Sequence, residues 1–336
     1  MPRRSRKNYP ALLELMAPNR SPNSPNRSKN KPILVSELEA PPSASVIVIA
    51  YNAARFLEEA IDSVLGQTFD DWEILIVDDG STDATNDVAH DLARKRPNRI
   101  HVLQHPDRRN HGMSAARNLG LSHARGDFIG FLDADDVWLP NKLSDQIEVL
   151  NEEPRAELIY GRTLIWHSWD HNSGLSDFYY DLGVDPNRIH DPPILFRILL
   201  SNKCQTPTTC NALIRRRLFA QVGSFETNFR GLYEDQVFFA KALVRAPAFV
   251  ADRTWAKYRQ HQQSCSAMAT REAELKARAR FLGRVAKELT HSGLAMNDRA
   301  TILRMLISSR LKLAKMHLHK MNISYWIAKD GGSNRA

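Results

Sequence analysis

The chain has 336 residues, 43% of them hydrophobic and 25% charged, which is enough apolar material for one large domain or two ordinary ones. Its 15 glycines, 17 prolines and three cysteines exclude collagen-like, low-complexity and disulfide-stapled proteins, and the lack of a Cys-x-x-Cys pair argues against a thiolate zinc site. Because cysteines are few and no apolar stretch is long enough to cross a bilayer, we expect a cytoplasmic protein.

The net charge of +8 is unevenly distributed along the chain. Residues 1–31 carry eight basic residues and one acidic residue, and residues 271–336 carry fourteen and five, so the part between them is acidic with a net charge of −8. An acidic body argues against nucleic acid as the partner of the whole surface. The basic ends have two interpretations, contact with an anionic membrane or simple solvation.

The predicted elements begin after a disordered basic tail at residues 1–43, whose first 31 residues hold few side chains that could be buried. Buried strands are predicted over residues 44–51, 72–77, 100–103 and 127–132, and amphipathic helices over 53–65, 84–94 and 114–124. This alternation of strand and helix predicts a doubly wound, mostly parallel α/β sheet with helices on both faces. Ligands of such a sheet bind at the carboxyl ends of its strands.

The second half of the chain has a weaker pattern. A helix is predicted from Pro140 to Asn151, a strand over 157–162, and further helices over 213–222, 235–244, 271–290 and 298–328. Residues 163–203 show no clear period. The last two segments predict a C-terminal helical extension.

Acidic residues follow the predicted strands where such a sheet binds its ligands. Asp78 and Asp79 come after one strand, Asp133 and Asp135 after another, and Asp235 opens a helix. Each alone is equally well a turn or helix-cap residue. Together they predict a site for Mg²⁺ or Mn²⁺ bound with a nucleotide diphosphate, because hard oxygen ligands and phosphate oxygens suit these ions.

Six short blocks carry a resemblance to a known family. In chain order they are Ser45-Val-Ile-Val-Ile-Ala-Tyr-Asn52, Ala60-Ile-Asp-Ser-Val-Leu-Gly-Gln-Thr-Phe69, Glu73-Ile-Leu-Ile-Val-Asp-Asp-Gly-Ser-Thr-Asp83, Gly112-Met-Ser-Ala-Ala-Arg-Asn118, Gly126-Asp-Phe-Ile-Gly-Phe-Leu-Asp-Ala-Asp-Asp136 and Tyr233-Glu-Asp235. As a series they resemble the family 2 inverting glycosyltransferases, which have the Rossmann-like GT-A fold. The resemblance implies a GT-A catalytic domain at residues 44–266, with residues 267–336 as the C-terminal basic helical extension.

The resemblance also implies where the donor nucleotide binds. Asp79 would accept a hydrogen bond from the base of a uridine nucleotide, and Tyr51 would lie beside that base. Asp133 would hold the ribose or the sugar and share the metal with Asp135, which would ligate the ion that bridges the diphosphate. Arg117 would pair with a phosphate or with the aspartates, unless it is only a surface arginine of its helix.

Two further groups of residues are assigned in the same way. Asp235 resembles the catalytic base that removes a proton from the acceptor hydroxyl, and Glu234 would raise the pKa of that base or orient the acceptor. Arg259 and His261, in the segment Tyr258-Arg-Gln-His-Gln-Gln-Ser-Cys-Ser266, would close over the diphosphate or reach the metal.

These assignments predict a metal-dependent inverting glycosyltransferase. It would move a hexose or N-acetylhexosamine from a UDP-sugar to an acceptor hydroxyl, on a glycan or lipid-linked glycan of the cell surface. Two alternatives are a sugar-1-phosphate nucleotidyltransferase and a non-catalytic protein that binds anions or nucleic acid. The first needs a glycine-rich phosphate loop after the first strand, which Tyr51–Arg55 does not supply, and no nucleic-acid motif supports the second.

The predicted C-terminal helix also has two interpretations. From Ala300 to Ala328, leucine, isoleucine and methionine are interleaved with lysine and arginine. The apolar side either packs on the catalytic domain, which we favour, or lies on an anionic membrane, which would make the protein peripheral on its inner face.

Overall fold

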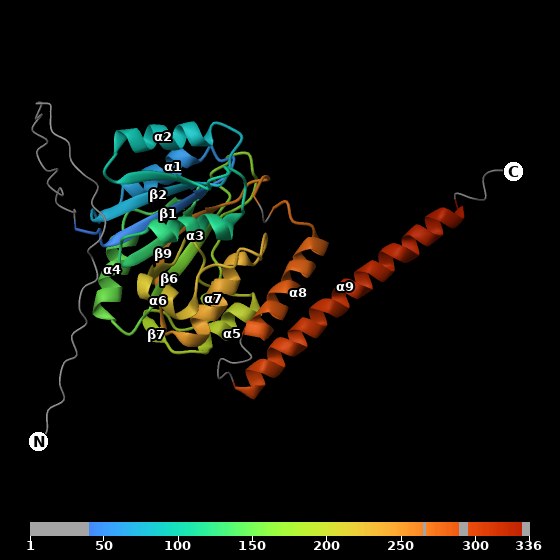
Figure 1. Ribbon diagram of the computed structural model, residues 1–336. Helices are drawn as coiled ribbons and strands as arrows, with labels where there is room; N and C mark the ends of the chain where they lie inside the picture. Colours follow the sequence, from blue (N-terminus) through green and yellow to red (C-terminus); the bar gives the residue numbers. More distant parts are fainter. Residues whose placement is uncertain (1–39, 265–266, 289–294, 331–336) are drawn as a thin grey trace, which may run out of the picture. The chain divides into compact units, whose positions relative to one another are not determined.

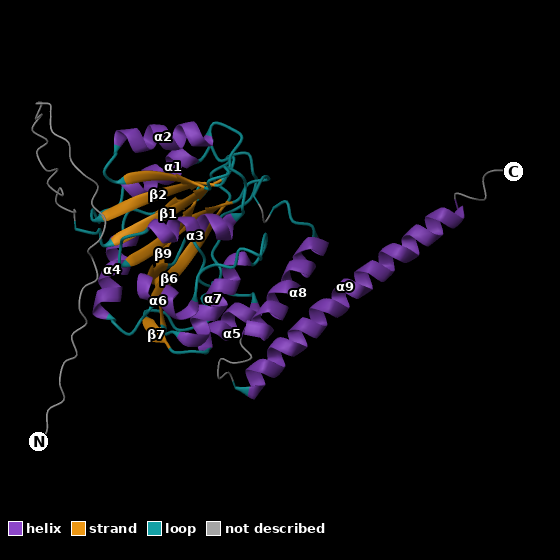
Figure 2. Cartoon of the chain, in the orientation of Figure 1, coloured by secondary structure: helices purple, strands orange, loops and turns teal. Residues whose placement is uncertain are grey.

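The computed structural model describes residues 40–264, 267–288 and 295–330, with side chains as far as Leu318. Within these residues it contains a nine-stranded sheet with helices on both faces and two helices after it, so the predicted GT-A-type α/β class is confirmed (Figures 1 and 2). Nearly all of the tail predicted at residues 1–43 lies outside the described residues.

The first half of the sheet is entirely parallel. It consists of β1 (Ala44–Ala50), β2 (Trp72–Asp78), β3 (Ile100–Gln104) and β4 (Phe128–Asp133), in the spatial order β3-β2-β1-β4. Every residue of β1 and β2 is buried. Their nearly continuous apolar sequences suit this position, because a parallel sheet is covered by helices on both faces.

The second half of the sheet is mixed. It adds β8 (Leu213–Arg215), β6 (Leu158–Trp166), β9 (Ala248–Arg259), β5 (Val137–Trp138) and β7 (Arg188–His190). Strands β6 and β9 are parallel, whereas β8 pairs antiparallel with β4 and β6, and β9 pairs antiparallel with β5 and β7.

Two hydrophobic cores lie on the two faces of the sheet. On one face, α1 (Leu57–Leu65), α2 (Thr85–Lys95) and α4 (Lys142–Glu152) cover the even-numbered residues of β1 and β2. On the other face lie α3 (Met113–His123), α5 (Ile194–Ser201), α6 (Arg216–Val222) and α7 (Glu234–Arg245). The alternation of side chains along each strand therefore divides its apolar residues between the two cores.

The two C-terminal helices are α8 (Arg271–Glu288) and α9 (Met296–Asp330). Phe281 and Leu282 of α8, with Ile302 and Leu306 of α9, belong to the same core as α5 and α7. This part of the extension packs as the favoured interpretation predicts. None of the helices in the described ranges combines the length and the apolar character that crossing a membrane requires.

The structure differs from the sequence-based expectations in several places, and it contains β5, β7 and α5, which were not predicted. The helix predicted over 213–222 is wrong for its first three residues, which form β8 because they pair with both β4 and β6. The helix predicted from Ala53 begins at Leu57. Strand β9 was not predicted, since its sequence mixes apolar residues with Asp252, Arg253 and Lys257.

Candidate active site

The carboxyl ends of β1, β2 and β4 lie at one edge of the sheet. The strands are parallel and in register, so that Ala50 pairs with Asp78 and Ile49 pairs with Asp133. Tyr51 directly follows β1, and its side chain is half exposed. The topology therefore brings the predicted base-binding and diphosphate-binding residues to the same edge, where ligands of open α/β sheets bind.

Asp79 joins the end of β2 to the loop before α3. Its carboxylate accepts backbone hydrogen bonds from His111 (2.9 Å) and Gly112 (2.7 Å), and His105 Nε2 lies 3.5 Å from Asp79 Oδ1. The next residue, Gly80, has a φ of 76°, and a Cβ there would lie 2.6 Å from the backbone of Arg109. Glycine is therefore required for this close approach. Asp79 is buried, and its carboxylate retains lone pairs that could accept a base N–H.

Arg117 is the centre of a buried ion-pair network. From α3 it donates to Asp133 at the end of β4 (2.8 Å) and to Glu234 at the start of α7, which also accepts from Ser114. Burial opposes the charge of Arg117, but the carboxylates of Glu234 and Asp133 raise its pKa. Burial in turn raises the pKa of Asp133, with Arg117 acting against it. Arg117 therefore pairs with carboxylates, which is one of the alternatives predicted for it. The side chain of Glu234 points toward Arg117.

Asp135 contacts the segment that contains Arg259 and His261. Its Oδ2 lies 2.9 Å from Nε2 of His261, and its carbonyl accepts from Nε of Arg259 at 2.7 Å. Arg259 is 3% exposed and also pairs with Glu59 of α1. The guanidinium of Arg259 lies 4.5 Å from the ring centre of Trp166, and this cation–π contact helps to hold the charged group in place. In this structure Arg259 thus positions the loop that carries Asp135.

Asp235 is the second residue of α7 and is half-buried. Its Oδ2 accepts from Gln236 Nε2 at 3.3 Å. Burial raises the pKa of Asp235 to about 7, the negative charge of Glu234 adds to this, and Arg117 acts in the opposite direction. A carboxylate with a pKa near neutrality is well suited to accept a proton during a reaction.

The residues around Asp135 fit a divalent cation that is shared with a ligand. Asp135 and His261 provide an oxygen and a nitrogen donor in contact with each other, while the carboxylate of Asp133 is engaged by Arg117. Across residues 40–264, 267–288 and 295–330, no group of three or more His, Cys, Asp or Glu converges to hold a metal unaided. Such a cation would thus take its other ligands from a diphosphate and water, as Mg²⁺ commonly does.

Comparison with known proteins identifies the family. The family model described as Glycosyl transferase family 2 matches residues 45–223, more than half of the chain. The chain belongs to glycosyltransferase family 2. The match ends before α7, so Glu234 and Asp235 lie outside it.

Proteins similar to this family 2 chain include TuaG, TarS and PcManGT. The putative teichuronic acid biosynthesis glycosyltransferase TuaG of Bacillus subtilis is 40% identical over 124 residues, which are 37% of this chain and 48% of TuaG. S. aureus TarS 1–349 in complex with UDP-GlcNAc has a TM-score of 0.61 at 20% identity, covering 80% of this chain and 73% of TarS. The mannosyltransferase PcManGT from Pyrobaculum calidifontis, in complex with GDP-Man and Mn²⁺, has a TM-score of 0.53 at 20% identity, covering 83% and 76%. The chain spans about half the length of TuaG, and the two solved structures have the same fold as this chain.

Some residues of the site in this family 2 protein were not predicted from sequence. Ser114 donates a hydrogen bond to Glu234, and Gln236 donates one to Asp235. Glu59 accepts a hydrogen bond from Arg259. Ser114 lies within a block that carries the resemblance, so its place in that block was an available signal. Glu59 and Gln236 lie on helices among other polar residues, and no signal in the sequence distinguishes them.

Proposed function

We propose that this chain is a metal-dependent inverting glycosyltransferase that moves a hexose or N-acetylhexosamine from a UDP-sugar to an acceptor hydroxyl. The observation that carries the proposal is the network in which Arg117 joins Asp133, at the end of β4, to Glu234, beside Asp235. This network holds a carboxylate with a raised pKa next to the strand ends where the donor nucleotide would bind.

The reaction follows from that arrangement. Asp235 accepts the proton of the acceptor hydroxyl as its oxygen attacks the anomeric carbon, while the bond from that carbon to the diphosphate breaks on the opposite face. A single displacement inverts the anomeric centre. Asp135 and His261 would hold the cation, which when bound neutralises the charge that develops on the leaving diphosphate.

Similar proteins support the choice of acceptor but differ in the donor that they bind. TarS is described in complex with UDP-GlcNAc, whereas PcManGT is described with GDP-Man, so the uridine donor rests on the expected contact of Asp79 with the base. TuaG is described as a putative teichuronic acid biosynthesis enzyme. We infer a glycan or lipid-linked glycan of the cell surface as the acceptor of this chain.

A peripheral position on an anionic membrane is the second part of the proposal. Leu303, Ile307 and Leu311 are about half exposed on α9, although Ile302 and Leu306 of the same helix are buried. At about 100° per residue, the exposed side chains form one stripe, with Arg310 on one side of it and Arg304 on the other. An apolar stripe with basic flanks is typical of helices that lie on anionic lipid. Cys204 and Cys210 are free thiols, which supports the cytoplasmic face.

The donor site is tested by calorimetric titration of UDP, GDP and ADP, each with Mn²⁺ and with EDTA. We expect UDP to bind most tightly and to need the metal. Preference for GDP would reject the uridine donor.

Asp135→Ala tests the metal ligand. It should weaken UDP binding with Mn²⁺ and change little in EDTA, whereas equal losses in both would indicate misfolding.

Asp235→Asn tests the catalytic base. It should retain metal-dependent UDP binding and lower kcat by about 10²–10⁴-fold, because it removes the general base. Normal turnover by Asp235→Asn would reject the base assignment.

A further inference from the structure

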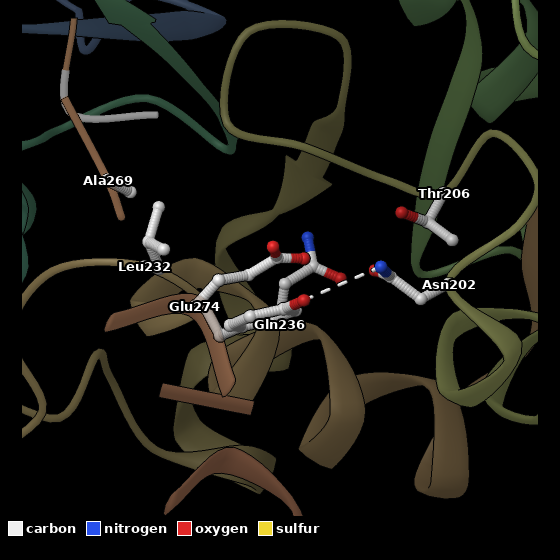
Figure 3. Close-up of a pocket in the computed structure, with 7 residues that line it drawn as sticks. Asn202, Thr206, Leu232, Gln236, Ala269 and Glu274 are labelled. Atoms are coloured by element: carbon white, nitrogen blue, oxygen red, sulfur yellow. Dashed lines mark hydrogen bonds between the residues drawn. The ribbon is translucent and has the colours of Figure 1, made fainter. Parts of the chain in front are cut away.

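A pocket of about 380 Å³ lies beside the first turn of α7 (Figure 3). Asn202 follows α5, Thr206 lies in the loop after it, and Glu274 belongs to α8. The remaining lining residues are Leu232, Tyr233, Gln236 and Ala269. This volume falls within the usual range of sites for small ligands. The lining includes none of the residues to which donor binding was assigned.

Gln236 connects the pocket to the proposed base. It lines the pocket and donates from Nε2 to Asp235 Oδ2 at 3.3 Å. The residue before Asp235, Glu234, forms an ion pair with Arg117. Arg117 in turn pairs with Asp133 at the end of β4. Asp235 thus lies between Glu234, which contacts Arg117, and Gln236, which lines the pocket, so the pocket is next to the proposed base.

Polar groups in the pocket suit a sugar ring. The side chains of Asn202 and Thr206 lie across the pocket from those of Gln236 and Glu274 (Figure 3). Asn202 Nδ2 donates to the Tyr233 hydroxyl at 3.4 Å. Within the described part of the chain, the carboxylate of Glu274 has no ion-pair or hydrogen-bond partner, so it is free to accept from hydroxyl groups.

One wall of the pocket is held in place by its neighbours. The ring of Tyr233 stacks on Phe281 with centroids 5.5 Å apart, and the guanidinium of Arg278 lies 5.4 Å from the Tyr233 ring centre. Phe281 and Arg278 belong to α8, so the C-terminal extension both supplies Glu274 and supports this wall. Leu232 and the Tyr233 ring offer apolar surface for the C–H groups of a pyranose.

We propose that this pocket is the acceptor subsite and that it takes an uncharged pyranose ring, with Glu274 disfavouring anionic sugars. Glu274 accepts hydrogen bonds from the ring hydroxyls, and its negative charge opposes a uronate or a phosphorylated sugar. This inference rests on the proposed function, since an acceptor subsite presupposes a donor. It goes beyond that function because it gives α8 a part in the choice of acceptor.

The test uses the full chain saturated with UDP and Mn²⁺ and titrated with four p-nitrophenyl glycosides. The probes are the β-glucoside, the β-galactoside, the N-acetyl-β-glucosaminide and the β-glucuronide. We expect at least one neutral glycoside to bind and the glucuronide not to bind. Glu274→Gln should weaken the neutral glycoside about tenfold, because a hydrogen bond to a charged group is lost, and should admit the glucuronide. Thr206→Trp, which fills the pocket, should abolish glycoside binding.

The controls separate this inference from the proposed function. Both variants should bind UDP as tightly as the unaltered chain, and Glu152→Gln, at an exposed position of α4, should change neither affinity. Unchanged glycoside binding in both pocket variants would overturn the subsite, as would a lack of binding by every glycoside in a UDP-bound protein. Binding of the glucuronide to the unaltered chain would overturn the charge selection. Failure of UDP itself to bind would instead count against the proposed function and remove the basis of the subsite.

Discussion

Asp235 shows how neighbouring side chains set the chemistry of a single residue. Its carboxylate is half-buried next to Glu234, while Arg117 compensates only part of the local negative charge. Burial and the charge of Glu234 both favour the protonated form, so the pKa of Asp235 rises to about 7. The base would thus change its protonation state near neutral pH.

A pH profile tests this property of Asp235. Only the ionised carboxylate can accept a proton, so kcat/KM should fall below about pH 7, approaching tenfold per unit on the acid side. Glu234→Gln removes the neighbouring negative charge and should therefore move this limb to lower pH. The measurement is the initial rate of UDP release between pH 5 and pH 8.5, with stability checked at each pH. A flat profile, or an unmoved limb in Glu234→Gln, would contradict the assignment.

The resemblance predicted which residue types form the site better than it predicted their partners. The predicted strands had already placed Asp79, Asp133 and Asp135 at the strand ends, where the structure has them. The resemblance left open whether Arg117 meets a phosphate or a carboxylate, and the structure shows Asp133 and Glu234 as its partners. The choice depends on which helices pack together, and a local sequence pattern contains no such information. The roles of these residues in catalysis remain predictions.

At the scale of elements, α3 is the link between the sheet and α7. Its glycine at position 120 lies against β1, where a Cβ would be only 2.4 Å from Cγ2 of Ile47. This close approach puts Arg117, on the same helix, within reach of both Asp133 and Glu234. The packing of α3 on the sheet therefore decides the geometry of the ion-pair network.

Two glycine substitutions measure this packing. Gly120→Ala should lower the free energy of unfolding by about 1–3 kcal/mol, because the added methyl group overlaps Ile47 in a filled core. Gly283→Ala on α8 is the matched control, since its Cβ would meet no heavy atom within 4 Å. That change should raise the free energy of unfolding by about 0.5–1 kcal/mol through helix propensity alone. Urea denaturation checks both values, and equal effects of the two substitutions would contradict the close packing of α3.

The elements were predictable to different degrees for a physical reason. The strands β1, β2 and β4 have nearly continuous apolar sequences, because helices cover both of their faces. Strand β9 has exposed positions at Asp252 and Arg253, which interrupt the apolar pattern. Strand β8 has only three residues, and its strand form depends on pairing with β4 and β6. Propensity cannot outweigh such pairing in a short segment.

At the scale of the whole molecule, the C-terminal helices have two kinds of surface. Ile302 and Leu306 are buried in the core, whereas Leu303, Ile307 and Leu311 are 49–57% exposed. The favoured prediction of packing on the catalytic domain thus describes one side of α9, and the other side is the candidate membrane surface.

Vesicle binding tests that surface. The full chain should sediment with vesicles that contain phosphatidylglycerol and not with vesicles of phosphatidylcholine alone, and added salt should weaken the binding. Replacing Leu303, Ile307 and Leu311 with Gln should reduce binding at least tenfold while leaving UDP affinity unchanged, since these side chains are exposed. Thr301→Gln, at an exposed position with no large apolar side chain, is the control on the same helix. Equal binding by the triple variant would reject the lipid contact.

The sequence by itself determined the α/β class, the parallel arrangement of β1 to β4 and the acidic residues at the strand ends. Those features follow from local apolar patterns and from residues close together in the chain. Only the tertiary structure decided that Arg117 reaches Glu234, 117 positions away, and that α8 completes a pocket beside Asp235. Contacts between distant residues arise when separate elements bury their apolar faces against one another, and this packing depends on the shape of the whole core.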